Sequence, residues 1–183
     1  MLKRKKIIII DGYNVLRNGH RYANLAGISP DFRDWTSDAW NAAREALLDD
    51  VFRLIDSDSQ AIIVYDAAQR YRDFNESEPP QQLKNVKVIF TDKGESADTR
   101  IQKLVFASRE KGMNVEVITS DFAIQNATMH EGVVRTSSRA FQNNLTENER
   151  AEQSINKPID NPHLIDVLDL ETAAKLKALR DSL

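Results

Sequence analysis

Four short runs of apolar, mostly β-branched residues, separated by longer polar stretches, constrain this 183-residue chain more than any other feature. Runs of four or five such residues have the length and composition of β-strands. The first two runs are continuous rather than alternating, which is typical of strands buried on both faces of a parallel sheet. The four runs are residues 7–10, 61–65, 86–90 and 115–118, and residues 132–136 are a candidate fifth strand.

Helical patterns occupy the segments between these runs. Ser37 is expected to cap a helix that runs to about Ile55, and Ser96 a second helix that ends at Gly112. Residues 122–130 are a candidate third helix. Strands that alternate with helices are typical of an α/β fold on a parallel sheet, in which the carboxyl ends of the strands lie at one edge.

The remaining segments set the expected domain organisation. Two long polar connections, residues 16–36 and 67–85, follow strands and are therefore expected at that same edge. The sequence later becomes polar again, before an amphipathic helix expected over residues 170–179. We therefore predict an α/β domain over residues 1–142 and a C-terminal segment, residues 143–183, whose helix packs on the domain.

Composition excludes several classes of protein. The absence of cysteine excludes disulfides, thiolate zinc sites and cysteine nucleophiles. No apolar run approaches the roughly 18 residues of a membrane helix, and the apolar stretch near the start is too short for a signal peptide, so a cytoplasmic protein without membrane contact is expected. A net charge of −3 and a pI of about 5.7 are not those of an autonomous nucleic-acid binder. Any nucleic-acid contact is therefore expected to be local or assisted by a partner.

Acidic residues follow the ends of the predicted strands. Asp11 and Asp66 come directly after the first two strands, and Asp121 follows the fourth strand by three positions. Asp98 lies in the first turn of the second predicted helix, on its apolar face, and Glu95 is three residues earlier. Since all of these positions meet at one edge of a parallel sheet, some of the carboxylates are expected to be neighbours.

Neighbouring carboxylates repel each other, so their clustering predicts a bound cation. Two carboxylates about 4 Å apart repel by about 4 kcal/mol at an effective dielectric constant near 20. Hard divalent cations with oxygen ligands relieve this repulsion, which predicts Mg²⁺ or Mn²⁺, and such ions assist phosphodiester hydrolysis. Taken singly, Asp66 and Asp121 are also explained as helix caps, and Asp98 as an acid favoured by the helix dipole. It is the conjunction of Asp11, Asp98 and Asp121 that favours a shared metal site.

Other acidic α/β sites fit the spacing less well. A phosphatase of the haloacid-dehalogenase type needs Asp-x-Asp after the first strand, where this chain has Tyr13. An integrin-type metal site needs Asp-x-Ser-x-Ser, which residues 11–15 do not supply. A receiver-like phospho-switch is closer and stays open, although it needs paired acids at the first strand and a lysine after the last. No GxGxxG motif and no P-loop is present, so no nucleotide cofactor is expected.

Four motifs in order resemble a known family. Residues 9–16 read IIDGYNVL, and the motifs VYDA, FTDKGESAD and ITSD follow at residues 64–67, 90–98 and 118–121. This series is similar to the NYN domains of the PIN-like nuclease superfamily, in particular to the YacP-like branch of bacterial endoribonucleases linked to ribosome-associated mRNA decay. The resemblance covers most of residues 7–140. It implies a three-layer PIN-like fold with a central, mostly parallel sheet flanked by helices.

The resemblance also implies metal-dependent RNA hydrolysis at the clustered acids. The metal ligands would be Asp11, Asp98 and Asp121, which together with Asn14 form the catalytic set. Asn14 would orient the first of these carboxylates or contact the phosphate. The auxiliary metal ligands would be Asp66 and Glu95.

The function predicted from these features is a Mg²⁺- or Mn²⁺-dependent endoribonuclease acting on mRNA, with the ribosome as a partner by resemblance alone. The alternative is a catalytically silent RNA- or ribosome-binding module that keeps the fold. Basic and polar residues at the active-site edge are expected to guide the RNA backbone. These candidate RNA contacts are Arg17, Arg21, Arg70, Arg72 and Ser120.

Overall fold

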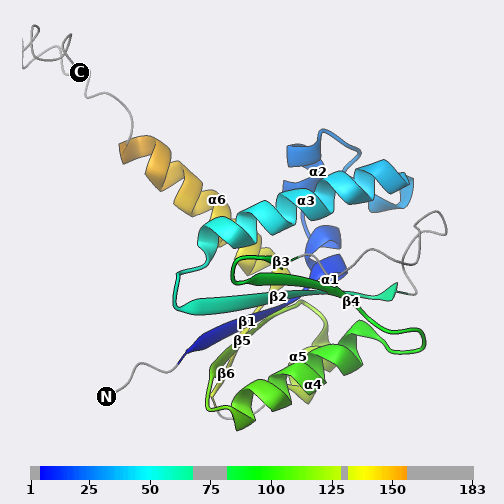
Figure 1. Ribbon diagram of the computed structural model, residues 1–183. Coiled ribbons are helices and arrows are strands. Elements are labelled where there is room, and N and C mark those ends of the chain that lie inside the picture. The colour runs from blue at the N-terminus through cyan, green and yellow to red at the C-terminus, as the bar shows by residue number, and fades with distance from the viewer. Residues whose placement is uncertain (1–4, 68–81, 129–131, 156–183) are drawn as a thin grey trace, which may run out of the picture. The chain divides into compact units, whose positions relative to one another are not determined.

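The computed structural model describes residues 5–67, 82–128 and 132–155. Its contacts divide the chain into two units, Met1–Glu147 and Asn148–Leu183, and the sheet lies in the first unit. In the described part of that unit the strands form one sheet in the order β3-β4-β2-β1-β5-β6, and all of them except β3 run parallel (Figure 1). The strands are β1 (Lys6–Asp11), β2 (Ser59–Tyr65), β3 (Gln82–Leu83), β4 (Val86–Phe90), β5 (Asn114–Ile118) and β6 (Val133–Thr136).

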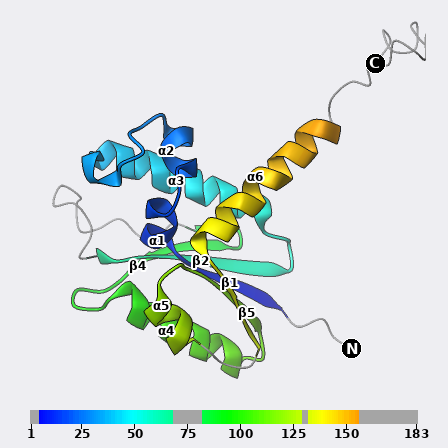
Figure 2. The ribbon, with the colours of Figure 1, turned by 180° about the vertical axis from the view of Figure 1, so that it is seen from behind.

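Helices cover both faces of this sheet. The first three, α1 to α3, lie on one face, and α4 and α5 lie on the other (Figures 1 and 2). These three layers confirm the predicted α/β class and its mostly parallel sheet. The helices are α1 (Gly12–Arg17), α2 (Arg21–Ala26), the short 3-10 helix η1 (Phe32–Asp34), α3 (Ser37–Leu54), α4 (Ala97–Glu110), α5 (Phe122–Ala127) and α6 (Ser138–Ile155).

Two hydrophobic cores lie on the two faces of the sheet. Residues of β1 alternate between them: Ile8 and Ile10 cluster with residues of α1 and α3, whereas Ile7 and Ile9 cluster with residues of α4. A strand that is covered on both faces has no polar side. This double burial explains the continuous apolar run in the sequence.

The helix boundaries differ from the predictions in detail. Ser96 caps α4 as predicted. Helix α3 is capped by Thr36 rather than by Ser37, because Thr36 has extended backbone and its hydroxyl oxygen accepts from the backbone N–H of Ala39. The end of α4 is at Glu110, just before Gly112 adopts a positive φ of 68°. Helix α5 is shorter than the predicted residues 122–130.

The segment of residues 16–36, predicted as a polar connection, folds instead into the end of α1, α2 and η1. Tyr22 and Trp35 are 1% and 4% exposed and join the core that includes α3. The indole of Trp35 also donates to the carbonyl oxygen of Ser29 at 2.6 Å. Single aromatic residues spaced among Arg, Asn and Gly produce no helical period, which is why the sequence pattern did not reveal this packing.

A second difference is α6, which occupies residues predicted to begin a polar segment. Its Phe141 and Leu145 are buried in the same core as α1 and α3. The predicted boundary between residues 142 and 143 therefore falls within this helix. Only one apolar residue per turn marks the buried face, so the segment reads as polar in sequence.

Several predictions lie outside the described residues. These are most of the connection of residues 67–85, with Arg70 and Arg72, and the amphipathic helix of residues 170–179. Within the described ranges, every helix is too short or too polar to span a membrane.

Candidate active site

The four aspartates predicted from strand ends meet at the carboxyl edge of the sheet. Asp11 ends β1, Asp66 follows β2, and Asp121 follows β5, and β1 lies between the other two strands. Asp98 comes from the first turn of α4, on the face opposite α1. One pocket of about 170 Å³ is lined by these acids and by Tyr13, Asn14, Arg17, Asn18 and Ala97.

Asp11 is the most buried of the four acids, with 7% of its surface exposed. Its Oδ1 accepts from the backbone N–H of Asn14 at 3.2 Å, and its Oδ2 accepts from the hydroxyl of Thr119 at 3.1 Å. Burial raises the pKa of Asp11 to about 6; the two hydrogen bonds oppose this shift, and the charges of Asp98 and Asp121 add to it. Ionising Asp11 therefore costs free energy, which a nearby cation would reduce.

Asp121 serves as a helix cap and as part of the pocket at once. Its Oδ1 accepts from the backbone N–H groups of Ala123 at 2.7 Å and Ile124 at 3.4 Å, which caps α5. Burial and the charge of Asp121 raise the pKa of Asp98, and Asp66 contributes in the same direction. The carboxylates of the pocket therefore repel one another, as the sequence analysis predicted.

The side-chain oxygen of Asn14 connects α1 to two segments that are distant in the sequence. Its Oδ1 accepts from the backbone N–H of Ser120 at 2.8 Å, the hydroxyl of Ser138 at 2.7 Å and the amide of Asn18 at 3.1 Å. Because this oxygen is saturated, the Nδ2 amide is the group that Asn14 can offer to a ligand in the pocket. The backbone N–H of Asn14 holds Oδ1 of Asp11, and the predicted catalytic role of Asn14 stays a prediction.

Ser120 and Ser138 form a framework beneath the pocket. Besides the bond to Asn14, the hydroxyl of Ser120 accepts from the backbone N–H of Ser138 at 3.0 Å. These bonds hold Ser120 in place, and its predicted RNA contact stays a prediction. Sequence reasoning missed Ser138, which is fully buried. Its signal was the same as that of Asp121, a polar residue just after a strand.

Gly12 makes the turn after Asp11 compact. A Cβ at this position would lie 2.2 Å from the Cε1 atom of Tyr65, whose ring is fully buried at the end of β2. Any larger residue would displace either the ring or the turn. The Asp-Gly-Tyr-Asn motif thus needs its glycine to bring Asp11 and Asn14 together.

Arg17 lies at the rim of the pocket on a platform of aromatic rings. Its guanidinium carbon is 5.4 Å from the ring centroids of Tyr13 and Phe32 and 5.5 Å from that of Trp40. Its Nε is buried without a hydrogen-bond partner. Among the described residues no acidic side chain forms an ion pair with Arg17. This cation is therefore held in place but not neutralised.

Arg21 is held in a buried ion pair, and its predicted RNA contact stays a prediction. Its guanidinium binds both oxygens of Asp50, at 2.8 and 2.9 Å, and both side chains are less than one-tenth exposed. It also donates to the hydroxyl of Thr146 at 3.2 Å. The pair therefore joins α2, α3 and α6, and its partners lie too far away in sequence to be recognised there.

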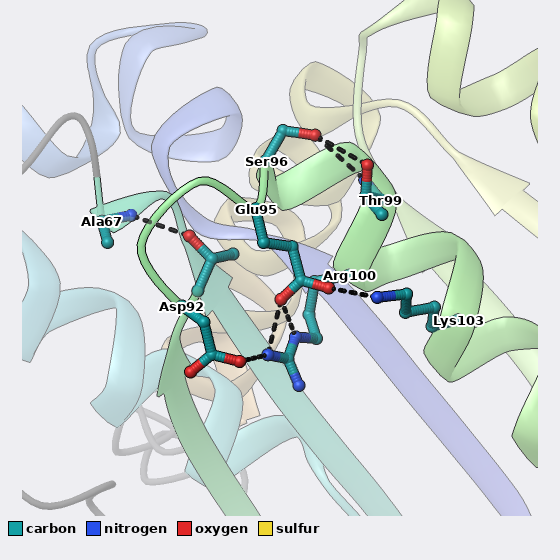
Figure 3. A network of polar contacts seen from close by, with 8 residues as sticks. Ala67, Asp92, Glu95, Ser96, Thr99, Arg100 and Lys103 are labelled. Carbon is teal, nitrogen blue, oxygen red and sulfur yellow. Dashed lines mark hydrogen bonds and ion pairs between the residues drawn. The ribbon is translucent and has the colours of Figure 1, made fainter.

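Glu95 does not line the pocket, contrary to its predicted role as an auxiliary metal ligand. Its carboxylate accepts from Arg100 at 2.6 Å and from Lys103 at 2.8 Å, and Arg100 also pairs with Asp92 (Figure 3). Hydrogen bonds from Lys103 and Arg100 lower the pKa of Glu95. The network formed by Asp92, Glu95, Arg100 and Lys103 supplies its own positive charge.

The chemistry of the pocket fits a hard divalent cation, although its side chains do not form a finished cage. In the ranges that the structure describes, no three acidic or histidine side chains are arranged to hold a metal ion. The available donors are nevertheless carboxylate oxygens in one pocket, and burial and mutual repulsion raise the pKa of both Asp11 and Asp98. Asp11, Asp98 and Asp121 would be the oxygen donors to such an ion. Among the described residues that line the pocket there is no lysine, which a receiver-like phospho-switch needs.

The chain is similar to known proteins in family, sequence and structure. The family model of the YacP-like NYN domain matches residues 8–181. The protein YacP of Bacillus subtilis (strain 168), described as uncharacterized, is 29% identical over 154 residues, which are 84% of this chain and 81% of the relative. The crystal structure of Rae1 (YacP) from Bacillus subtilis matches with a TM-score of 0.59 at 25% identity, over 96% of this chain and 94% of that chain. A mutant of Rae1 matches with a TM-score of 0.60 at 24% identity, over 95% of this chain and 99% of that chain, and supports the fold.

Proposed function

The chain belongs to the YacP-like NYN domain family, and from this premise we propose that it is an endoribonuclease that hydrolyses RNA phosphodiester bonds with Mg²⁺ or Mn²⁺. The family belongs to the PIN-like nuclease superfamily, which indicates a nuclease-type hydrolase. The observation that carries the proposal is the pocket in which Asp11, Asp98 and Asp121 meet without an ion-pairing partner among the described residues.

Asp11, Asp98 and Asp121 would hold the ion, with Asp66 beside them. A bound divalent ion supplies an activated water and stabilises the negative charge that develops on the phosphate and the leaving oxygen. The products of this hydrolysis would be a 5′-phosphate and a 3′-hydroxyl.

The chain's own groups would orient the reactants. Thr119 and the backbone N–H of Asn14 fix the two oxygens of Asp11, so that this carboxylate keeps one orientation. The Nδ2 amide of Asn14 would donate to a non-bridging phosphate oxygen. Arg17, held on its rings, would place a positive charge beside the same phosphate. Fixed donors of this kind act without reorganisation at the moment of reaction.

We further propose mRNA as the substrate, the ribosome as a partner and the cytoplasm as the location. The motif resemblance supports the first two of these proposals. The net charge of −3 supports a partner, because an acidic chain attracts RNA weakly by itself. A nucleotide cofactor is not part of the proposal.

The test is cleavage of an mRNA with Mg²⁺ or Mn²⁺, with and without translating ribosomes, by the wild type, Asp98→Asn and Glu95→Gln. The last variant is the matched control, because Glu95 is an acid only three residues before Asp98 that lies outside the pocket. We expect cleavage by the wild type and by Glu95→Gln and none by Asp98→Asn. Cleavage only in the presence of ribosomes would identify the ribosome as the platform. Equal cleavage by wild type and Asp98→Asn would overturn the site assignment.

A catalytically silent RNA- or ribosome-binding module is the second candidate. The observation in its favour is that the described acids do not form a finished metal cage. RNA or ribosome binding without cleavage under any of these conditions would support this candidate over the nuclease.

A further inference from the structure

A second and larger hollow adjoins the acidic pocket. It has a volume of about 910 Å³ and shares Arg17 and Asn18 with the pocket. Its walls come from the turn between α1 and α2, from η1 and from the first turns of α6. We call it the arginine groove, since it is lined by Arg17, Arg21, Arg33 and Arg139.

The arginine groove carries positive charge that the chain leaves unneutralised. Its acidic lining residue, Asp31, is already bound by Arg33 through both carboxylate oxygens. Arg139 is exposed, and within the described part of the chain it forms no ion pair and no side-chain hydrogen bond. Arg17 is held only by aromatic rings. Two guanidinium groups without counterions therefore line a hollow that leads into an acidic pocket.

The rest of the lining suits a ligand with both charged and base-like parts. The side chains of Asn24 and Asn143 are exposed and offer amide donors and acceptors. Phe32 presents a partly buried ring, and His20 an exposed imidazole. A positive groove that tracks a phosphate backbone beside aromatic rings is typical of proteins that bind single-stranded nucleic acid.

We propose that the arginine groove binds the single-stranded stretch of RNA that lies next to the scissile phosphate. Arg17, at the junction, contacts the phosphate nearest the acids, and Arg139 contacts a phosphate further along the strand. The identity of the ligand rests on the proposed nuclease function. A hollow of this size takes a drug-sized ligand, or about two nucleotides. A duplex is instead recognised across grooves that span many base pairs, which this hollow cannot follow.

The test is the binding of a short fluorescent RNA in EDTA, measured by anisotropy over a series of salt concentrations, for the wild type, Arg139→Ala and Arg53→Ala. Arg53 is an exposed arginine at the end of α3, outside the groove, so Arg53→Ala controls for the change in net charge. We expect Arg139→Ala to weaken binding several-fold for all sequences and to reduce the salt slope by about 0.7, the value for one phosphate contact to a single strand. Arg53→Ala should match the wild type, and the complementary duplex should bind more weakly than the single strand.

Adding Asp98→Asn to the binding and cleavage assays separates this inference from the proposed function. If Asp98→Asn binds RNA without cleaving it while Arg139→Ala binds as well as the wild type, the groove inference is wrong and the nuclease stands. If Arg139→Ala weakens binding while even the wild type does not cleave, the nuclease is wrong and the groove stands. Equal affinity for duplex and single strand would overturn the single-strand preference. Thermal melting of Arg139→Ala should match the wild type, because Arg139 is exposed.

Discussion

Two groups of acidic side chains come after strands that end at the same edge of the sheet. One group is neutralised by basic side chains of the same chain. Asp92 and Glu95 are bound by Arg100 and Lys103 (Figure 3). Asp98 is only three residues after Glu95, yet it lies in the pocket with Asp11 and Asp121, and none of these three has an ion-pairing partner among the described residues. The pKa of Glu95 is lowered, whereas the pKa values of Asp11 and Asp98 are raised.

This difference separates acids that the chain neutralises itself from acids that it leaves without a counterion among the described residues. An acid neutralised by its own chain is complete without a ligand, and its ionised form stabilises the fold. Acids kept together without a counterion destabilise the folded state when ionised, so such a cluster favours a role in binding a cation. Sequence position alone groups Glu95 with Asp98, and only the partners of each side chain separate them.

Removing one charge from either group is expected to have the largest effect, a loss of RNA cleavage, when the charge belongs to the pocket. Asp121→Asn keeps an efficient helix cap, because Asn caps as well as Asp, but removes one charge from the pocket. We expect its RNA cleavage rate to fall by about 100-fold or more with little change in melting temperature. Asp92→Asn removes an acid from the neutralised network and should cleave at nearly the wild-type rate. Equal losses of cleavage rate in the two variants would contradict the distinction between the two groups of acids.

The next effect is stabilisation by metal, measured as melting temperature without RNA. A ligand present at 100 times its dissociation constant stabilises the folded state by about 2.7 kcal/mol, which raises the melting temperature of a chain of this size by about 5–10 °C. Mn²⁺ should therefore raise the melting temperature of the wild type and of Glu95→Gln, and not that of Asp98→Asn. A similar rise in Asp98→Asn would place the ion elsewhere.

A third effect is a pH dependence of opposite sign in the two groups. Folding raises the pKa of Asp11 from 3.8 to about 6, so the folded state holds this proton more tightly, and the associated stability is present below pH 3.8 and lost as the pH rises through about 6. The pKa difference corresponds to at most about 3 kcal/mol. Because folding lowers the pKa of Glu95, its ionised carboxylate stabilises the folded state at pH values above the ordinary pKa of a glutamate. This stability is lost as the pH falls.

Urea unfolding in EDTA at a series of pH values measures this dependence. Asp11→Asn should lose the decline in stability between about pH 4 and 6 that the wild type shows. Glu95→Gln should keep that decline and lose part of the wild type's decrease in stability at lower pH. An unchanged profile in Asp11→Asn would assign the pH dependence to another group.

The smallest expected effect is the loss of the Glu95 ion pairs. Lys103 is largely exposed, and pairs in contact with solvent contribute little to stability and are screened by salt. Glu95→Gln should therefore lower the melting temperature only slightly at low salt, and the difference from the wild type should shrink as salt is added. A large, salt-independent loss would show that the network holds the loop before α4 in place.

The sequence analysis predicted the features that follow from the ends of strands. It missed the features that depend on contacts between residues far apart in the chain. The pocket of Asp11, Asp66, Asp98 and Asp121 followed from the convergence of parallel strands at one edge. The pairing of Arg21 with Asp50, 29 residues away, leaves no local pattern. The sparse buried residues of α2 and α6 were also invisible, because their burial depends on helices that pack from elsewhere in the chain.

The hydrogen bonds to the side-chain oxygen of Asn14 also limit when the pocket can be completed during synthesis. Its partners Ser120 and Ser138 lie 106 and 124 residues further along the chain. A nascent chain that has not yet released β6 and the start of α6 contains the acids but not the bonds that arrange them. Contacts between such distant residues form late and slow folding. The protein therefore completes this pocket only as the first unit is completed, and a truncated product carries the motif without the bonds that arrange it.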